Sequence, residues 1–264
     1  ARANDTAADY VRARIRERIK DPKVADLLCP TDHPYATKRP ALETDYFVTY
    51  NRDNVTLVDV RAAPITAITA TGIRTAEQDY ELDVIVLATG FDAVSGPLFN
   101  LGIVGRGGVK LSERWAQGPK TYLGIASAGF PNLFMISGPQ APFANIPMVI
   151  DRAANWIGGA LRHLKATGQD RIEARPEACR QWTDYVQMLL DATLLSEGAK
   201  LHSWFLGANI PGKPRVFMPY IGGLPAYIQA CERVVANGYE AAGHTGEITT
   251  MVLVPQVVEA VARQ

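Results

Sequence analysis

Hydrophobic and polar positions follow two different rhythms along the chain, one helical and one typical of strands. In residues 5–20, apolar residues recur every three or four positions with arginines between them, a spacing that predicts an amphipathic helix. The same spacing predicts long helices at residues 148–167 and 176–195. A further helix is predicted after the double glycine at positions 222 and 223.

Short apolar runs bounded by Gly, Pro or Asn predict strands. The runs VTLVDV (55–60) and DVIVLATGF (83–91) are apolar on both faces, which is typical of central strands covered on two sides. Between them, Ile65 and Ile68 lead to a turn after which Ile73 resumes, so two more short strands are expected. Buried strands that alternate with helices predict an α/β fold. Further strand-like pieces are TYLGIAS (121–127), NLFMIS (132–137) and RVFMPY (215–220).

The segment that follows the first helix contains four prolines from Pro22 to Pro40. Proline lacks a backbone N–H and restricts the residue before it. Pro22 is therefore expected to end the helix, and the segment is expected to form an extended, ordered loop.

Composition limits the classes of function. The 264 residues carry 27 Lys and Arg and 27 Asp and Glu, so we expect neither a nucleic-acid partner nor binding to an acidic membrane. No apolar run has the length of a membrane-spanning helix. Three cysteines without CxxC spacing and four scattered histidines predict no metal site, and a reducing cytoplasm is the expected location. The chain begins ARAND without an initiator Met, which fits either trimming or a piece of something longer.

The run 83–91 contains Ala88, Thr89 and Gly90, small residues that could let a cofactor lie against the end of a strand. The alternative is a tight strand exit that uses the conformational freedom of glycine. No G-x-G-x-x-G loop is present to hold a pyrophosphate, and the nearest pattern, VGRGGV (104–109), is predicted to be a surface turn.

Four phrases, in this order, together resemble one family, the flavin-dependent Baeyer-Villiger monooxygenases of the cyclohexanone and phenylacetone type. The resemblance runs from Asp5 to about Tyr239. Members of the family carry two glycine-rich fingerprints with a His and Trp-Pro signature between them, and this chain has none of the three. The phrases are CPTDHPYATKRPALETDYF (29–47), LDVIVLATGFDAVSG (82–96), GFPNLFMISGPQAPFANIP (129–147) and SWFLGANIPGKPRVFMPYIGGLPAY (203–227).

The resemblance implies the C-terminal portion of a Rossmann-like α/β flavoprotein with two dinucleotide-binding domains and helical segments. It implies that residues 1–45 are the end of a helical subdomain with the active-site loop, and that residues 46–90 are the last strands of the NADPH-binding domain. Residues 91–240 would be the C-terminal part of the FAD-binding domain, and residues 241–264 a tail. Ala88, Thr89 and Gly90 would then lie where the two domains are linked.

The resemblance gives two residues of the proline-rich loop specific roles. An oxygenated, anionic flavin needs a neighbouring cation that keeps its proton, and arginine meets this need better than lysine. Arg39 is identified by resemblance as this catalytic arginine. Lys38 would point to the other side of an extended segment, and the resemblance assigns it to the extra phosphate of NADPH. The alternatives are a loop arginine bonded to nearby carbonyls and a solvated lysine.

The loop GPQAPFANIP (138–147) is stiffened by three prolines. The resemblance implies that the amides of Gln140 and Asn145 contact the pyrimidine edge of the flavin. Phe143, Ala144 and Ile146 would then line an apolar pocket for the substrate. The alternative is a rigid connector before the next helix.

Trp204 offers an apolar face and one indole donor. The resemblance places it beside the nicotinamide ribose and the substrate, on a loop that orders when NADPH binds. A buried core tryptophan is the alternative.

These patterns lead to one favoured function and two alternatives. The favoured one is the C-terminal part of a Baeyer-Villiger monooxygenase that uses FAD, NADPH and O2 to convert a ketone into an ester or lactone, active only with the N-terminal half of the enzyme. The first alternative is a related flavin monooxygenase that oxygenates nitrogen or sulfur. The second is a non-catalytic α/β module that needs a partner chain.

Overall fold

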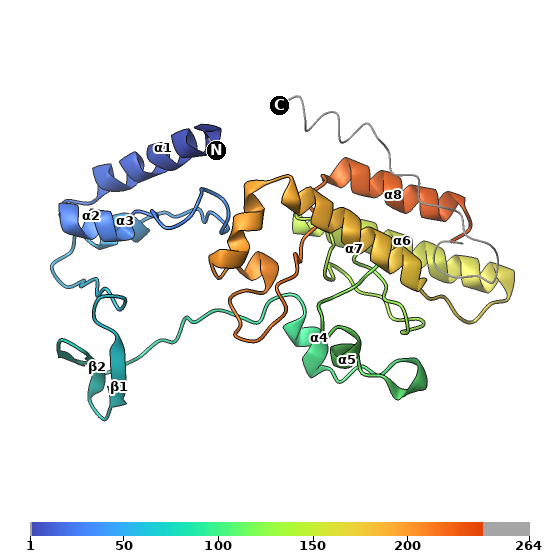
Figure 1. Cartoon of the computed structure of the whole chain (residues 1–264), viewed down its shortest axis with the longest axis horizontal. Coiled ribbons are helices and arrows are strands. Elements are labelled where there is room, and N and C mark those ends of the chain that lie inside the picture. The colour runs from blue at the N-terminus through green and yellow to red at the C-terminus, as the bar shows by residue number, and fades with distance from the viewer. Residues whose placement is uncertain (1, 240–264) are drawn as a thin grey trace. The chain divides into compact units, whose positions relative to one another are not determined.

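The computed structural model describes residues 2–239, with the backbone alone for Ala199. The chain forms two compact units, of which the first ends at Phe91 and the second begins at Asp92. The predicted tail, residues 241–264, lies outside the described residues. In chain order (Figure 1) the elements are α1 (Arg2–Arg18), α2 (Pro22–Leu28), α3 (Tyr46–Thr49), β1 (Ile65–Thr69), β2 (Gly72–Thr75), β3 (Asp79–Glu81), α4 (Gly96–Asn100), η1 (Arg106–Gly108), α5 (Leu111–Arg114), α6 (Ile146–Thr167), α7 (Pro176–Asp191), η2 (Leu194–Lys200), η3 (Trp204–Leu206) and α8 (Leu224–Ala236).

The first unit begins with two helices that share a small apolar cluster. α1 confirms the amphipathic helix predicted for residues 5–20. Pro22 does end α1, but it then starts α2 instead of an extended loop, because proline is well tolerated where the first helical N–H has no partner. The Asp21 carboxylate caps α2 by accepting from the backbone N–H of Lys23 at 2.8 Å. The buried cluster consists of Ile15, Ile19, Ala25 and Cys29.

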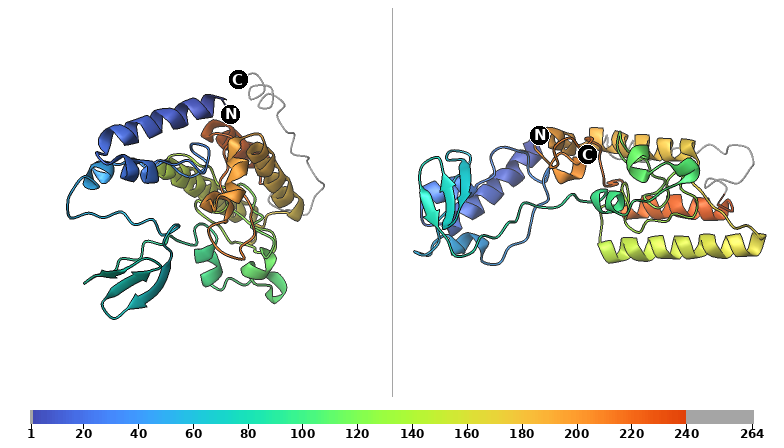
Figure 2. Two further views of the ribbon diagram at one scale, coloured as in Figure 1. Left: turned by 60° about the vertical axis from the view of Figure 1, so that its left-hand side comes forward. Right: turned by 90° about the horizontal axis from the view of Figure 1, so that it is seen from below.

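The described part of the first unit contains one sheet, with three antiparallel strands in the order β1-β2-β3 (Figure 2). β1 and β2 confirm the two short strands predicted between the apolar runs. The runs 55–60 and 83–91, predicted as central strands, are not strands here, and nearly all of the second is exposed. A central strand needs a partner on each edge and cover on both faces, and this small sheet supplies neither to them.

Three long helices organise the second unit as far as residue 239. α6, α7 and α8 confirm the helices predicted from sequence spacing, and α6 lies alongside α8 (Figure 2). α6 ends where Gly168 takes a left-handed conformation with φ 67°, a common helix C-cap for glycine. Each helix turns one stripe inward. The buried stripes are Val149, Ala153, Trp156, Ala160 and Leu164 on α6, Ala178, Cys179, Trp182, Val186 and Leu190 on α7, and Tyr227, Cys231 and Val234 on α8.

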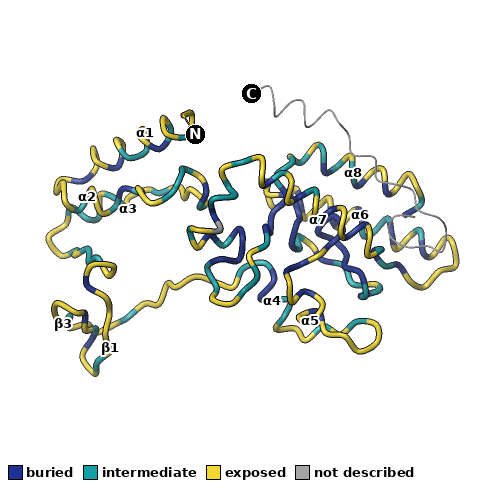
Figure 3. The backbone as a smooth tube through the Cα atoms, viewed as in Figure 1, coloured by how far each residue is buried: buried dark blue, intermediate teal, exposed yellow. Residues whose placement is uncertain are grey.

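The other strand-like pieces lie in the second unit as irregular chain (Figure 3). Residues 121–127 and 217–220 are buried, but they form no ladder, and their β-bridges are isolated ones, Tyr122 with Ala126 and Pro142 with Tyr220. The predictions of strands at 121–127, 132–137 and 215–220 were therefore wrong. A short apolar run indicates burial more reliably than it indicates strand pairing. The predicted surface turn at 104–109 is confirmed, because η1 is exposed.

Candidate functional site

The 138–147 loop is fixed by backbone pairing to residues 218–220. The N–H of Gln140 donates to the carbonyl of Met218, and Tyr220 exchanges hydrogen bonds of 2.8 Å with Ala141 and Phe143. Gly124 makes room for this arrangement, because a Cβ at that position would lie 2.5 Å from the backbone nitrogen of Ala141. The loop is thus a rigid platform in front of α6.

Gln140 is buried beneath the loop, with 1% of its surface exposed. Its Oε1 accepts from the hydroxyl of Thr121 at 2.9 Å, the N–H of Thr121 at 3.2 Å and the hydroxyl of Thr183 at 3.2 Å. Its Nε2 donates to the carbonyl of Pro119 at 3.3 Å. This placement differs from the predicted contact between the Gln140 amide and the flavin, because both polar atoms face groups inside the protein. The sequence near Gln140 does not predict these partners, because they lie 19 to 43 positions away.

The other predicted residues of the loop face outward. Asn145 is exposed and precedes α6 as its N-cap, with no hydrogen bond from its side chain to the helix. Phe143 and Ile146 are 45% and 48% exposed, and Ala144 is half-buried. An exposed amide beside an apolar wall is an arrangement that can hold the edge and the face of a planar ring.

The structure brings this wall together with the loop that carries Trp204. The ring of Phe143 meets that of Phe205 edge-on, with 5.2 Å between centroids, and Phe205 lies 4.5 Å from the ring of Trp204. Trp204 is half-buried, and its indole N–H has no hydrogen-bond partner within residues 2–239. Trp204 therefore has both a free donor and accessible ring surface, unlike the fully buried Trp182.

Lys213, which the sequence reasoning missed, ties the Trp204 loop to the start of the second unit. Its side chain is only 7% exposed, and its ammonium group contacts the carboxylate of Asp92 and the carbonyl of Ala93. Gly96 permits the close approach, since a Cβ there would lie 2.5 Å from the carboxyl carbon of Asp92. Two oxygen acceptors, one of them charged, thus hold the ammonium group against residues 92 and 93.

We expect Lys213→Met to loosen this loop while the helices of the second unit stay intact. The substitution keeps most of the apolar stem and removes the charge that holds Asp92. Amide hydrogen exchange of residues 204–213 should accelerate about tenfold, as expected for the loss of roughly 1.4 kcal/mol. Lys200→Met, which removes a 77% exposed lysine from a pair with Glu197, is the control. Unchanged exchange in Lys213→Met would contradict the role of the pair.

Ala88, Thr89 and Gly90 lie at the end of the first unit, where all three are exposed. None of them makes a hydrogen bond with another residue of the described chain. Gly90 has φ 89°, and no atom lies within 4 Å of a Cβ built on it. The strand exit predicted here is therefore an open, extended piece of chain.

Arg39 and Lys38 lie in the first unit, on a loop anchored by Thr37. Thr37 is 1% exposed, and its hydroxyl donates to the carbonyl of Pro34 at 2.8 Å. Lys38 is half-buried, and Arg39 is exposed. The guanidinium of Arg39 makes no ion pair or hydrogen bond with another described residue, so the bonds to nearby carbonyls considered as an alternative are not seen.

Near this loop, Asp32 carries the most perturbed carboxylate of the first unit. A hydrogen bond with His33 at 2.6 Å, with help from Arg61 at 3.1 Å and the charge of Lys38, lowers the pKa of Asp32 to about 2. The ionised carboxylate therefore stabilises the folded loop above the ordinary pKa of 3.8, and this stabilisation is lost as the pH falls through about 2.

We expect Asp32→Asn to destabilise the first unit at pH 7 by less than about 1 kcal/mol, since the pair is partly exposed and screened. The difference from the unaltered chain should shrink as the pH falls from 4 toward 2. Amide exchange of α1 and α2 at several pH values measures it, with Asp53→Asn, which changes an exposed aspartate of the same unit, as a control. A difference that grows toward low pH would refute this linkage.

Neither cysteine of the second unit is an activated nucleophile, because both are buried. Burial raises the pKa of Cys179 to about 11 and that of Cys231 to about 12, so both thiols stay protonated at neutral pH. Within residues 2–239, no three His, Cys, Asp or Glu side chains gather as a metal site. Nor is any helix in that range long and apolar enough to cross a membrane.

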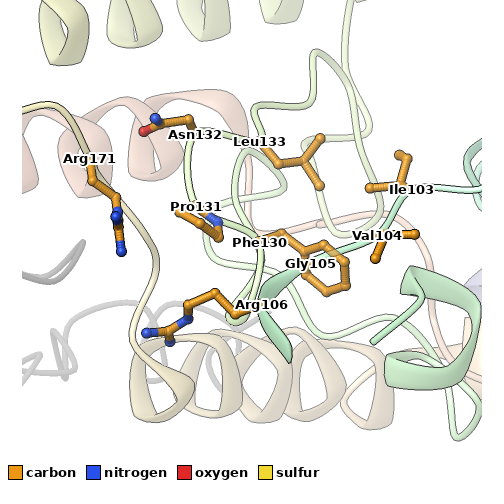
Figure 4. A pocket seen from close by; sticks show the side chains of 9 residues that line it. All are labelled: Ile103, Val104, Gly105, Arg106, Phe130, Pro131, Asn132, Leu133 and Arg171. Carbon is orange, nitrogen blue, oxygen red and sulfur yellow. The ribbon is translucent and has the colours of Figure 1, made fainter. Parts of the chain in front are cut away.

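A cavity of about 570 Å³ opens elsewhere on the second unit (Figure 4). Arg106 lies in its wall and bonds Glu173 at 2.8 Å, and Glu173 also accepts from the N–H of Gly129 at 2.6 Å. None of the predicted site residues lines this cavity. Its lining consists of Ile103, Val104, Gly105, Arg106, Phe130, Pro131, Asn132, Leu133 and Arg171.

Comparison with known proteins shows which family the chain resembles. The chain is 43% identical over 238 residues to a Baeyer-Villiger monooxygenase of Pseudooceanicola batsensis, a match that covers 90% of this chain and 43% of that protein. The chain is homologous to the Baeyer-Villiger monooxygenases. It is also 41% identical over 239 residues, 90% of this chain and 43% of the relative, to a phenazine N-monooxygenase of Lysobacter antibioticus. No family model matches the chain.

Solved structures of the Baeyer-Villiger monooxygenases agree with this result. A closed crystal structure of cyclohexanone monooxygenase matches with a TM-score of 0.87 at 40% identity, over 91% of this chain and 45% of that one. OTEMO in complex with FAD and NADP matches with a TM-score of 0.85 at 41% identity, over 91% and 44%. The predicted family and flavoprotein fold class are thereby confirmed. The chain spans less than half the length of the relatives it matches.

Proposed function

We propose that this chain is the C-terminal part of an FAD- and NADPH-dependent Baeyer-Villiger monooxygenase that converts a ketone into an ester or lactone with O2. The contact of Phe205 with both Phe143 and Trp204 is the observation that carries the proposal. Through Phe205, the exposed apolar side chains of the 138–147 loop lie next to a tryptophan whose indole N–H is free to donate. A site that holds a ketone beside a nicotinamide cofactor needs both features.

The exposed part of the 138–147 loop fits one end of FAD. Asn145 offers an amide to the polar edge of the isoalloxazine ring, and the N–H groups of Ile146 and Met148 at the start of α6 have no intrahelical acceptor. Gln140 does not fit such a contact, because its amide is buried. We assign it instead to holding the loop in place.

The described residues do not fit the pyrophosphate of either cofactor. Binding of this group requires a glycine-rich turn at a helix N-terminus, and residues 2–239 contain none between a strand and a helix. The nucleotide ends would therefore be held by the polypeptide that the relatives carry outside the matched region. When bound, NADPH supplies the hydride and FAD the oxygen-activating chemistry.

In this proposal Arg39 stabilises negative charge at the reacting ketone. Its guanidinium keeps its proton at any physiological pH and offers several donors in a fixed plane. A cation already in place when charge develops on the carbonyl oxygen lowers the barrier without reorganisation. Lys38, one position away on the same anchored loop, would contact the additional phosphate of NADPH.

The experiment that tests this function supplies the missing polypeptide. The chain is co-expressed with the unmatched part of the Pseudooceanicola batsensis relative, and the purified complex is examined for flavin absorbance and for product from cyclic and linear ketones, O2 and NADPH. We expect bound FAD and ester or lactone as the product. A complex that binds FAD but oxidises no ketone refutes the proposed activity, and a complex that binds no FAD favours the non-catalytic module.

Oxygenation of nitrogen is the second candidate, favoured by the likeness to the phenazine N-monooxygenase. An aromatic substrate would suit the exposed ring of Phe143 and the half-buried ring of Trp204. The same complex, assayed with aromatic N-heterocycles, amines and sulfides, separates the two activities. N-oxide formation without ester formation would replace the first proposal with the second.

A further inference from the structure

The cavity of about 570 Å³ on the second unit is built from three segments that lie far apart in the sequence (Figure 4). They are residues 103–106, residues 130–133 and Arg171, which lies between α6 and α7. Its volume falls within the range of about 300–1,000 Å³ that is usual for small-molecule sites. The proposed function gives this cavity no ligand, because no residue assigned to a cofactor or to the ketone lines it.

Two arginines give the cavity a polar end. Figure 4 shows the guanidinium groups of Arg106 and Arg171 on one side of the pocket, with Asn132 beside them. The carboxylate of Glu173 accepts from Arg106 at 2.8 Å, which holds that guanidinium in the wall. Arg171 makes no hydrogen bond or ion pair with another residue of the described chain. Two guanidinium groups against one carboxylate leave a single positive charge at this end, which a ligand with one negative charge would balance.

Asn132 fixes the backbone on both sides of Arg171. Its Nδ2 donates to the carbonyl of Asp170 at 3.0 Å, and its Oδ1 accepts from the N–H of Ile172 at 3.0 Å. Its own backbone N–H donates to the carbonyl of Ile172 at 2.9 Å. An anion that binds to a guanidinium on a fixed backbone has less chain to order than one that binds to a mobile loop. The unpaired arginine is therefore preorganised at the edge of the cavity.

The opposite end of the cavity is apolar. Figure 4 shows Ile103, Val104 and Leu133 there, across the pocket from the guanidinium groups. Phe130 is 3% exposed and anchors this end in a buried cluster. Gly105 permits the close approach of the two loops, because a Cβ on it would lie 2.8 Å from the ring of Phe130. Val104 is 57% exposed, so aliphatic surface remains open to a ligand.

We propose that this cavity binds a small aliphatic monocarboxylate. Its carboxylate pairs with Arg171, assisted by the N–H groups of Arg106 that Glu173 leaves unused, and its hydrocarbon part lies at the apolar end. The planar fork of a guanidinium matches a carboxylate with two parallel hydrogen bonds. A phosphate monoester, with a charge of about −1.5 to −2 at neutral pH, would exceed the positive charge available. This inference goes beyond the proposed function and does not depend on it.

The test measures binding to the full chain and needs neither cofactor nor turnover. Isothermal titration calorimetry compares octanoate with acetate, 1-octanol and inorganic phosphate. We expect one octanoate per chain, bound at least about tenfold more tightly than each of the other three, because it alone uses both ends of the cavity. Amide exchange of residues 103–108 and 130–133 should slow when octanoate is present.

Four variants make the test specific. Arg171→Leu should weaken octanoate binding at least about tenfold and leave the binding of 1-octanol unchanged. Arg171→Lys keeps the charge without the planar fork and should bind with intermediate affinity. Val104→Glu places a negative charge at the apolar end and should weaken octanoate binding as strongly as Arg171→Leu does. Arg180→Leu, which removes a 58% exposed arginine from a pair with Glu177, is the control and should bind octanoate normally.

Three results would overturn the inference: octanoate that binds no better than acetate, Arg171→Leu that binds octanoate normally while circular dichroism shows it folded, or phosphate that binds more tightly than octanoate. Several octanoate molecules per chain, or protection of residues 138–147 instead of 103–108, would also overturn it, because the hydrocarbon would then be adsorbed elsewhere. None of these results bears on ketone oxidation by the complex, so this inference and the proposed function can fail separately.

Discussion

Replacing Arg39 by alanine, in the chain combined with the complementary polypeptide, is expected to lower the rate of ester formation by about 10²–10³-fold. NADPH should still be oxidised, because the proposed role of Arg39 concerns charge on the reacting ketone and not hydride transfer. Oxygen would then accept the electrons without entering the ketone, giving hydrogen peroxide. Product analysis, NADPH consumption and a peroxide assay on the same sample measure this loss of coupling.

Two further variants make the Arg39 prediction specific. Arg39→Lys keeps the charge but loses the planar arrangement of donors, so its rate should lie between those of the alanine variant and the unaltered protein. Arg61→Ala removes an 80% exposed arginine of the same unit and should leave ester formation unchanged. If Arg39→Ala forms ester at the normal rate, or binds no FAD, the assigned role is wrong.

The helices could be predicted from the sequence because each depends on a local pattern. α6 and α7 need only an apolar stripe at helical spacing and a terminator such as Gly168. The central strands failed for the opposite reason. Residues 83–91 carry the composition of a buried strand, but a strand forms only beside a paired neighbour, and the described chain offers these residues none. The prediction of central strands at 55–60 and 83–91 was therefore wrong for this structure.

The candidate site shows the same division between local and distant causes. The apolar wall expected from Phe143, Ala144 and Ile146 came from the family resemblance of the loop, and the structure leaves Phe143 and Ile146 exposed. The burial of Gln140 depends on hydrogen bonds from Thr121 and Thr183, which lie near it only because distant segments fold together. The contact of Lys213 with Asp92 spans 121 positions and has no sequence signal. The chemical character of a side chain can thus be predicted from the local sequence. Its hydrogen-bond or ion-pair partners cannot, because they lie far away in the sequence.

Gln140 and Asn145 were both predicted to contact the flavin, but Gln140 is buried and Asn145 is exposed. Substitutions at the two positions should therefore differ in their effect on the free energy of unfolding. Gln140→Leu should lower the free energy of unfolding of the second unit by about 2–6 kcal/mol. The N–H of Thr121 and the carbonyl of Pro119 each lose the partner that Gln140 supplies, and an unsatisfied buried group costs about 1–3 kcal/mol. Urea unfolding followed by tryptophan fluorescence reports this unit, because all 4 Trp lie in it.

Asn145→Leu is the matched control, because the same change of residue type falls on an exposed side chain without a capping bond. Its unfolding free energy should stay within about 0.5 kcal/mol of the unaltered chain. In the complex the effects should reverse, with Asn145→Leu weakening flavin retention because a donor to the ring is lost. If Gln140→Leu unfolds normally yet loses flavin, the amide contacts the cofactor after all. The pair of variants therefore distinguishes a residue that holds the 138–147 loop in place from one that contacts the flavin.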